Sequence, residues 1–550
     1  MIAQNTTNKT SKMSRVANLA LIIIQCFGVV LNGTIGERPV ATDRFIHGVV
    51  LDALMRSKAD PESRPGPITV QYILILFEIA NLFVFICNVC CEPNLGSLLF
   101  MGRPIGSLGV IRPPIVSDTN DQFEEQWFEQ RVDHFNKQDN RTFKQLYYVE
   151  DSHYKSGGPV FLMISGEDEV SSIWLTNATY MGELAQRFGA LAVILEHRYY
   201  GRSVPTPDLS TENLKYLTTQ LALKDLEQFA LYLTKKLSLE GSKWVAFGGS
   251  YPGALAAWFR QKYPNTAVGA IASSAPVEAI INNPNYLGVV SESLGKECSD
   301  NIRKAHIELE NLLKTPEGVI KLRKTLNLCQ SFDGKNINDN RWLVQGPMTN
   351  IAMIVQYNNN IDRVRKIMND SSIGTPLERY ARVQGVNQTL PCSDFKYDDM
   401  ISILKNTTID HKGMARQWYY QMCTELGYFQ TSDIPDSIAG HSIPLEFYVK
   451  KCADIYGPQF TAQSIQKAVD RTNAYYGGLK PNVTNVVFPN GSLDPWHSLS
   501  ILKDLNNSTK AVMVENYSHG GDMWGSTPKD TQSLKNAHKL IDQQITEYLK

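Results

Sequence analysis

The sequence predicts an α/β fold in which helices cover both faces of a mostly parallel sheet. Three observations predict it. Short apolar runs alternate with longer helical patterns, one apolar run ends in a glycine-rich turn, and 43% of the residues are hydrophobic. With 550 residues, the chain is long enough for a large core and more than one domain.

The expected strands are short, continuous and apolar, as strands covered on both faces should be. They are residues 159–164, 191–195, 244–247, 268–272, 485–488 and 511–514. The helical patterns cover residues 181–188, 219–237, 254–263 and 531–548. Such alternation favours a mostly parallel sheet.

A sharp turn follows the expected strand 244–247. Residues 244–253 read Trp-Val-Ala-Phe-Gly-Gly-Ser-Tyr-Pro-Gly, which is typical of a strand that ends in a turn with Ser250 at its tip. Small residues suit this turn because its backbone is strained. The generic pattern has glycine two residues after the serine, whereas this chain has Pro252 there and Gly253 next.

An acid and a base follow the serine in the order that α/β-hydrolases use. Residues 484–494 run from an apolar strand into a turn that ends at Asp494. Residues 511–519 form another strand pattern, which ends at His519 before two glycines. Either residue alone has a plainer interpretation, since Asp before Pro often begins a turn. Together with Ser250, their order and their places after strands predict a catalytic triad.

The chemistry that these residues predict is acyl transfer. His519 would accept the proton of the Ser250 hydroxyl and return it to the leaving group, while Asp494 holds the imidazole in the right tautomer. The expected oxyanion hole consists of backbone N–H groups from Tyr251, directly after the serine, and from Gly166, in the loop after strand 159–164.

Four motifs extend these observations. They are residues 196–203 (Glu-His-Arg-Tyr-Tyr-Gly-Arg-Ser), 248–253 (Gly-Gly-Ser-Tyr-Pro-Gly), 490–496 (Asn-Gly-Ser-Leu-Asp-Pro-Trp) and 519–523 (His-Gly-Gly-Asp-Met). From about residue 101 onwards, the chain resembles the prolyl carboxypeptidase and dipeptidyl peptidase II family, and within it the thymus-specific serine protease branch. The resemblance implies the triad Ser250, Asp494 and His519 in a luminal or secreted peptidase that cleaves beside proline, at one end of a peptide.

Two loops depart from the usual pattern of that branch. Residues 165–168 read Ser-Gly-Glu-Asp instead of Gly-Gly-Glu-Gly, and residues 520–523 read Gly-Gly-Asp-Met instead of Cys-Ala-Asp-Met. Ser165 and Asp168 could crowd the oxyanion loop, and Asp168 adds a negative charge there. Two alternatives therefore stay open: an esterase or lipase that uses the same triad, and a catalytically weak peptide-binding protein.

The serine and the acid are separated by more chain than a bare hydrolase core needs. Residues 284–481 carry few strand signals and several helix-compatible segments, such as 301–313 and 463–475. We interpret them as a large helical cap domain inserted into an α/β-hydrolase core of residues 101–283 and 482–550, which the resemblance supports. Such a cap would narrow access and favour short peptides or chain ends.

Cysteine usage indicates an oxidising compartment. Of nine cysteines, four lie in apolar N-terminal segments and five in the expected cap. The resemblance implies two disulfides, Cys329–Cys392 and Cys423–Cys452. It leaves Cys298 unpaired, because Arg365 stands where relatives often carry a cysteine.

Sequons for N-glycosylation suit a secretory route. The candidates are Asn140, Asn177, Asn387, Asn406 and Asn482. The expected location is the lumen of lysosomes or endosomes, or the cell exterior, with a membrane anchor as an open alternative.

Residues 1–100 contain two apolar segments. Residues 16–31 follow basic residues, as in a signal peptide, and residues 68–91 have nearly the length of a membrane span. Three alternatives stay open. The catalytic part could face the cytosol, which conflicts with the cysteines and sequons. Basic residues before the second segment favour a signal or anchor that sends the C-terminal part into the lumen. The third alternative is a faulty gene model.

Composition narrows the expected partners. The net charge is −1, so the chain has no basic field for nucleic acid. The sequence shows no metal-spaced His/Cys cluster and no phosphate loop, so we expect no metal and no cofactor. The expected partner is a peptide substrate, and a homodimer stays open.

Overall fold

The computed structural model describes residues 99–100, 103–104, 123–358, 360–386, 388, 391–410 and 414–550. All of them belong to one unit, Pro93–Lys550. The predictions for the two N-terminal apolar segments and for Asn387 lie outside the described residues. Within the described part, no helix has the length and apolar character that a membrane span requires.

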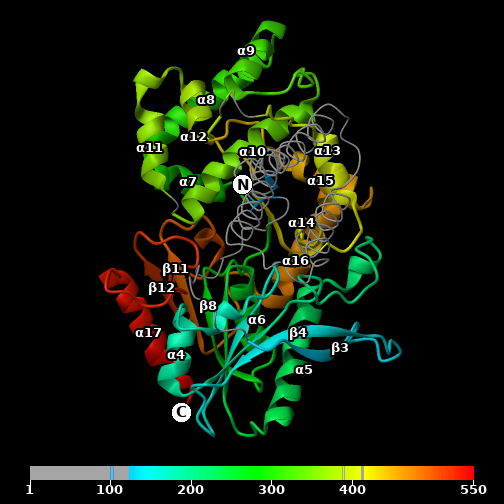
Figure 1. Ribbon diagram of the computed structural model, residues 1–550, viewed down its shortest axis with the longest axis vertical. Coiled ribbons are helices and arrows are strands. Elements are labelled where there is room, and N and C mark those ends of the chain that lie inside the picture. Colours follow the sequence, from blue (N-terminus) through cyan, green and yellow to red (C-terminus); the bar gives the residue numbers. More distant parts are fainter. Residues whose placement is uncertain are drawn as a thin grey trace, which may run out of the picture. The chain divides into compact units, whose positions relative to one another are not determined.

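An eight-stranded sheet runs through this unit in the order β12-β11-β8-β7-β5-β6-β4-β3 (Figure 1). Neighbouring strands from β12 to β6 are parallel, while β4 runs antiparallel to β6 and β3 antiparallel to β4. The strands are β3 (Gln126–Arg131), β4 (Thr142–Glu150), β5 (Val160–Ile164), β6 (Leu191–Leu195), β7 (Trp244–Gly249), β8 (Ala267–Ser273), β11 (Val486–Gly491) and β12 (Thr509–Val514). This is the predicted α/β-hydrolase core.

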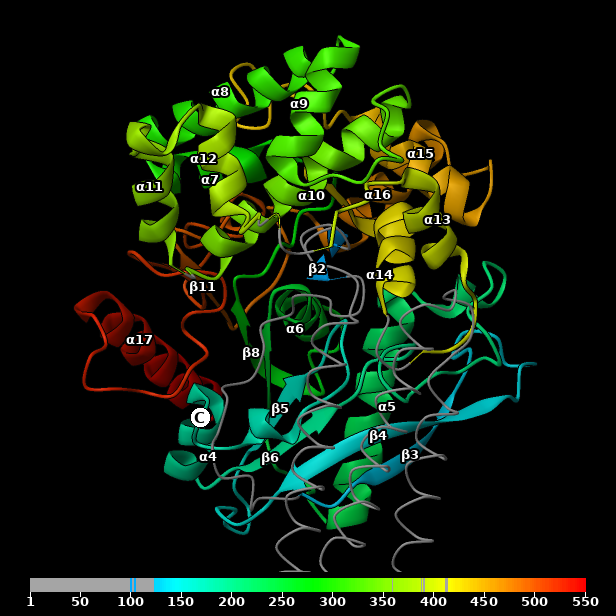
Figure 2. The same ribbon diagram turned by 45° about the horizontal axis from the view of Figure 1, so that its top comes forward.

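Helices cover both faces of the sheet, as Figure 2 shows. Along β5, Leu162 packs in one hydrophobic cluster with residues of α5 (Thr219–Leu237) and α6 (Tyr251–Lys262). The neighbouring Phe161 packs in a second cluster, on the opposite face, with residues of α4 (Tyr180–Phe188) and α17 (Gln532–Tyr548). Because side chains alternate along a strand, a strand buried on both faces reads as a continuous apolar run.

All six predicted strands and all four predicted helices of the core are present, but β3 and β4 were not predicted. Both lie at the antiparallel end of the sheet, and their sequences mix polar with apolar residues. Because exposed polar residues interrupt both sequences, neither strand forms a continuous apolar run. The two strands therefore carry no such signal in the sequence.

Residues between the strand β9 (Ile280–Asn282) and β11 are mostly helical and lie above the sheet in Figure 1. The helices are α7 (Asn285–Leu294), α8 (Lys296–Leu312), α9 (Pro316–Leu326), α10 (Ile337–Gln356), α11 (Ile361–Asn369), α12 (Pro376–Val383), α13 (Tyr397–Lys405), α14 (Ala415–Gln421), the π-helix η5 (Met422–Leu426), α15 (Leu445–Tyr456) and α16 (Ala462–Tyr476). The boundaries of a separate cap domain remain a prediction.

Short elements complete the described part. They are the antiparallel pair β1 (Leu99–Phe100) and β2 (Arg103–Pro104), the strand β10 (Gly427–Phe429), which runs parallel to β9, and the 3₁₀ turns η2 (Ser172–Leu175), η3 (Asn213–Tyr216), η4 (Ser371–Ile373) and η6 (His497–Leu499).

Both implied disulfides are formed, Cys329–Cys392 and Cys423–Cys452. Cys298 is a buried free thiol. The guanidinium of Arg365, at the position where relatives often carry a cysteine, donates to the carbonyl oxygens of Ser293 at 2.6 Å and Leu294 at 3.2 Å. Arginine therefore stabilises the C-terminal end of α7 by capping its last carbonyls.

Candidate active site

The predicted nucleophile lies at a sharp turn between β7 and α6. Ser250 has φ 65° and ψ −133°, a conformation that residues other than glycine rarely adopt. A side chain at Gly248 would lie 2.1 Å from the carbonyl oxygen of Pro252. A side chain at Gly253 would lie 2.7 Å from the carbonyl oxygen of Ser273. Glycine is thus required at both positions, because α6 packs closely on the strands, and the elbow tolerates Pro252 in place of the generic glycine.

The predicted acid and base form a hydrogen-bonded pair. Nδ1 of His519 donates to Oδ2 of Asp494 at 2.9 Å, and both side chains are buried. The other carboxylate oxygen, Oδ1, accepts the backbone N–H of Trp496 at 2.9 Å. Nε2 of His519 is buried and has no hydrogen-bond partner among the described residues. This is the geometry in which an imidazole can act as a base at Nε2.

The carboxyl end of β8 connects the loops that carry the three predicted residues. The backbone N–H of Ser250 donates to the carbonyl oxygen of Ser273 at 2.9 Å. The next residue, Ser274, donates its N–H to the carbonyl oxygen of Pro489 in β11 at 2.7 Å, and its Oγ accepts the N–H of Gly520 at 2.9 Å. The nucleophile loop and the base loop are therefore hydrogen-bonded to two adjacent residues, Ser273 and Ser274.

Sequence reasoning did not single out these two serines. The available signal was a pair of hydroxyl residues directly after an apolar strand, at a sheet edge where catalytic loops were expected. The hydroxyl of Ser273 also donates to a carboxylate oxygen of the buried Asp522 at 2.5 Å. This hydrogen bond attaches the base loop to the end of β8 a second time.

The two predicted oxyanion donors lie on segments in direct contact. Tyr251 is the first residue of α6, so its N–H has no partner within the helix, and it lies at the positive end of the helix dipole. A side chain at Gly166 would lie 2.4 Å from Cγ of Pro252, so the loop after β5 packs against the first turn of α6. That these two N–H groups bind an oxyanion remains a prediction.

The unusual residues of the oxyanion loop do not force a left-handed backbone. Neither Ser165 nor Asp168 has a positive φ, so the glycines that the branch usually carries there are not needed for that reason. Oδ1 of Asp168 accepts the N–H of Glu169 at 2.9 Å.

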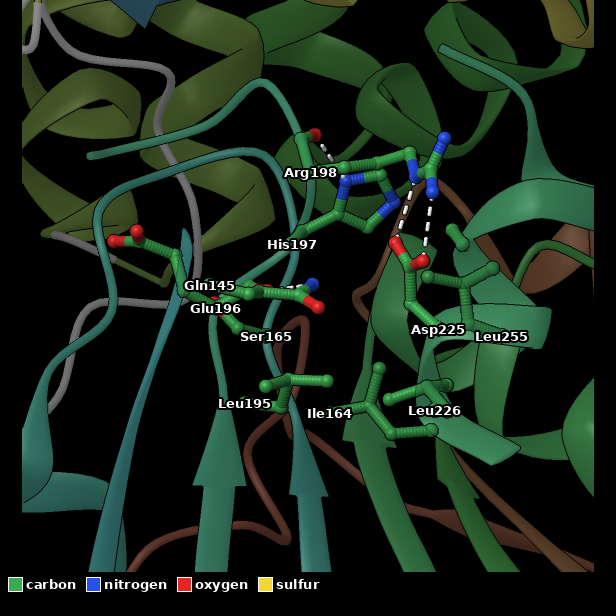
Figure 3. A pocket seen from close by; sticks show the side chains of 11 residues that line it. Gln145, Ile164, Ser165, Leu195, Glu196, His197, Arg198, Asp225, Leu226 and Leu255 are labelled. Carbon is green, nitrogen blue, oxygen red and sulfur yellow. Dashed lines mark hydrogen bonds and ion pairs between the residues drawn. The ribbon is translucent and has the colours of Figure 1, made fainter. Parts of the chain in front are cut away.

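The residues Glu196, His197 and Arg198 brace the core, as expected for a buried motif. Arg198 donates through Nε and Nη2 to the carboxylate of Asp225 in α5, at 2.6 and 2.7 Å. Figure 3 shows this ion pair beside a small cavity that Ser165 and His197 also line. None of the three predicted triad residues lines this cavity.

The carboxylate of Glu196 holds the turn after β6. It accepts the N–H groups of Val170 at 3.1 Å and Arg202 at 3.0 Å, and the hydroxyl of Ser203 at 2.6 Å. Burial raises the pKa of Glu196 to about 7, against the effect of these three donors. The motif therefore has a structural role.

The side chain of Tyr251 is fixed from two sides. Its hydroxyl accepts from Nε2 of Gln421, at the end of α14, at 2.8 Å, and lies 3.1 Å from Nε2 of His197. Burial lowers the pKa of His197 to about 4 and raises the pKa of Tyr251 well above its usual value, so both are neutral at physiological pH. These contacts hold the residue after the nucleophile in place.

Comparisons with known proteins found one matching family model and several similar proteins. A family model described as serine carboxypeptidase S28 matches residues 130–541, a span that includes all four motifs. A serine protease of Caenorhabditis elegans is 34% identical over 486 residues, which cover 82% of this chain and 94% of the relative. The thymus-specific serine protease of Mus musculus is 35% identical over 448 residues (77% and 87%). The lysosomal Pro-X carboxypeptidase of Homo sapiens is 29% identical over 462 residues (80% and 91%).

Proposed function

Because this chain belongs to the serine carboxypeptidase S28 family and is a serine peptidase, we propose that it hydrolyses peptides next to proline, near one end of the peptide, with Ser250 as nucleophile. One observation carries the proposal. The buried His519 is bonded to Asp494 at 2.9 Å through Nδ1, its Nε2 has no partner among the described residues, and its loop is bonded to the same strand end as Ser250.

The proposed reaction begins when Oγ of Ser250 attacks the carbonyl carbon of the scissile bond and Nε2 of His519 takes the hydroxyl proton. The oxyanion that forms accepts hydrogen bonds from the N–H groups of Tyr251 and Gly166. His519 then gives the proton to the leaving amine, and an acyl-enzyme remains. Water, deprotonated by His519, releases the acid and restores the serine. Asp494 orients the imidazole throughout.

Restricted access supports a preference for chain ends. Ser250 is 7% exposed and His519 2%, so little of either side chain is open to solvent, which suits a small substrate or a chain end. The preference for proline rests on the likeness to the lysosomal Pro-X carboxypeptidase. Mass spectrometry of the released products distinguishes cleavage at the amino end from cleavage at the carboxyl end.

Further observations support a secretory route. Disulfides persist in oxidising compartments, and this chain forms two within its helical segment. Four of the proposed glycosylation sites have exposed side chains: Asn140, Asn177, Asn406 and Asn482. With the likeness to a lysosomal enzyme, they support a glycoprotein of the lysosomal or endosomal lumen or of the cell exterior.

Labelling of the glycosylated full chain with a fluorophosphonate tests the nucleophile. We expect one adduct, on Ser250, and none in the Ser250→Ala variant.

A peptide library with matched proline and alanine pairs at both ends, read by mass spectrometry, tests the substrate. Proline-dependent release from one end supports the proposal. Cleavage of esters alone would favour an esterase, and the absence of both labelling and cleavage would favour a peptide-binding protein.

A further inference from the structure

Four residues form a closed cycle of hydrogen bonds around the acid and the base. Asp494 accepts from Nδ1 of His519 at 2.9 Å and from the backbone N–H of Trp496 at 2.9 Å. The backbone N–H of His519 donates to the carbonyl oxygen of Gln356 at 2.9 Å. The indole Nε1–H of Trp496 donates to Oε1 of the same glutamine at 3.0 Å, which closes the cycle.

Gln356 is the member of this cycle that comes from outside the acid and base loops. It is the last residue of α10, in the helical segment between β9 and β11, and it is 140 residues away from Trp496 in the sequence. One residue of the helical segment therefore binds the loop of the acid through its side chain and the loop of the base through its backbone.

We propose that Gln356 is a positioning residue, whose amide fixes the relative placement of Asp494 and His519. The proposal rests on the proposed roles of these two residues in catalysis. Gln356 does not touch the reacting atoms and acts through Trp496 and through the backbone of His519.

The amide of Gln356 is itself held in one orientation. Its side chain is 2% exposed. Oε1 accepts the hydroxyl of Tyr286 at 2.7 Å in addition to the indole, and Nε2 donates to the hydroxyl of Tyr357 at 2.9 Å. This set needs an acceptor and a donor on one side chain of this length. Glutamine supplies both the acceptor and the donor without a charge, whereas glutamate would place a buried negative charge here.

The partners of the amide also contact the acid and base loops directly. The ring of Tyr286 packs edge-on against Trp496, with centroids 5.1 Å apart. The ring of Tyr357 packs edge-on against the imidazole of His519 at 6.1 Å. A change in the amide is therefore transmitted to both loops through packed aromatic rings as well as through hydrogen bonds.

Loss of the amide would leave the buried indole N–H of Trp496 without this acceptor, and the loop would shift to satisfy it. Because the backbone N–H of Trp496 is also a donor to Asp494, the carboxylate would move with the loop. Misplacement of a catalytic group by about 1 Å can lower a rate by about 100-fold.

The variant Gln356→Met tests this role, because methionine has nearly the same shape but cannot make these hydrogen bonds. We expect kcat to fall by about 10- to 100-fold, KM to stay within about twofold, and the fluorophosphonate labelling rate to fall as kcat does. The matched control is Gln384→Met. The side-chain amide of Gln384 is hydrogen-bonded to Pro347 and Asn350 of α10, and no hydrogen bond among the described residues joins it to the catalytic loops. The kcat of this control should therefore stay within about twofold of the parent.

A double-mutant cycle keeps the proposal falsifiable even if Gln356→Met lowers stability. If Gln356 acts through Trp496, then Trp496→Phe should lower kcat in the parent but have little further effect in the Gln356→Met background. Multiplicative losses, or a Gln356→Met kcat within about twofold of the parent, would overturn the inference. If the parent itself fails to label at Ser250, the proposed function fails instead.

Discussion

The residues around the predicted nucleophile share an unusual backbone. Ser250 at φ 65° and Ser274 at φ 47° both have left-handed dihedrals that residues other than glycine rarely adopt. Ser250 is hydrogen-bonded to Ser273 at the end of β8, and Ser274 is hydrogen-bonded to β11 and to Gly520, so the surrounding structure supports the strain. At this scale, a single atom can bind a whole loop: Oγ of Ser274 accepts the N–H of Gly520, the residue after His519.

Substitution of Ser274 by alanine removes that oxygen and keeps Cβ. The buried N–H of Gly520 then loses its acceptor, and we expect the free energy of unfolding to fall by about 1–2 kcal/mol and kcat by about tenfold. Steady-state kinetics and denaturant unfolding measure both. Ser500→Ala is the control, because Oγ of Ser500 is buried without a partner among the described residues. Equal effects of the two variants would contradict the role of Ser274.

At the scale of elements, two helices direct opposite ends of their dipoles at the site. The N-terminus of α6 lies at the predicted oxyanion hole, where negative charge would develop in the proposed reaction. The C-terminus of α10 binds the loop of His519, which would become positive in that reaction. The turn after β6 is in turn bound to α5 by the buried ion pair of Arg198 and Asp225. The helices thus bring partial charges to the site as well as side chains.

Removal of one charge of that pair should be costly. In Asp225→Asn, Arg198 stays buried without its counter-ion, and His134, whose Nε2 lies 2.7 Å from the carboxylate, loses a charged partner. We expect a loss of about 3–5 kcal/mol in the free energy of unfolding, measured by denaturant titration.

A surface pair provides the comparison for this variant. Asp504 and Lys510 are 2.8 Å apart, with half of the Asp504 side chain exposed. Asp504→Asn should therefore cost less than about 1 kcal/mol. The double variant Asp225→Asn/Arg198→Met should recover part of the loss, since no buried charge remains. A loss for Asp225→Asn as small as that for Asp504→Asn would contradict the expectation.

At the scale of the whole molecule, buried histidines and buried glutamates have opposite effects on how stability changes with pH. Burial lowers the pKa values of His197 and His306 from 6.5 to about 4, so their contribution to stability is present above pH 6.5 and lost as the pH falls to 4. Burial raises the pKa values of Glu196 and Glu425 from 4.5 to about 7, so their contribution is present below pH 4.5 and lost as the pH rises to 7. The contributions of these four groups to the pH dependence of stability therefore largely cancel between pH 4.5 and 6.5.

Single variants should reveal each slope. The imidazole of His306 has no hydrogen-bond partner among the described residues, so His306→Phe removes a titration without breaking a bond. Relative to the parent, its free energy of unfolding should rise by about 1.4 kcal/mol per unit as the pH falls from 6.5 to 4. For Glu425→Gln, the free energy of unfolding relative to the parent should rise as the pH rises from 4.5 to 7. Unfolding curves over this range measure both, and pH-independent differences would refute the assignment.

Much of the core and the candidate triad follow from local patterns. Continuous apolar runs identified β5, β6, β7, β8, β11 and β12, because a strand covered on both faces has no polar side. The Gly-Gly-Ser turn and the order of Ser250, Asp494 and His519 identified the candidate residues, because a loop after a parallel strand ends at the catalytic edge of the sheet. The mixed polarity of β3 and β4 carried no such signal.

The contacts that orient those residues have no local signature. Gln356 and Trp496 lie far apart in the chain, and nothing in either segment indicates that their side chains meet. The left-handed backbone of Ser274 is likewise imposed by β11 and the base loop, not by its own preference. Residue types and their spacing therefore define the chemistry of this chain and its sheet. Which side chains support the acid and the base depends on long-range packing, because a hydrogen bond between distant segments exists only once both are folded against each other.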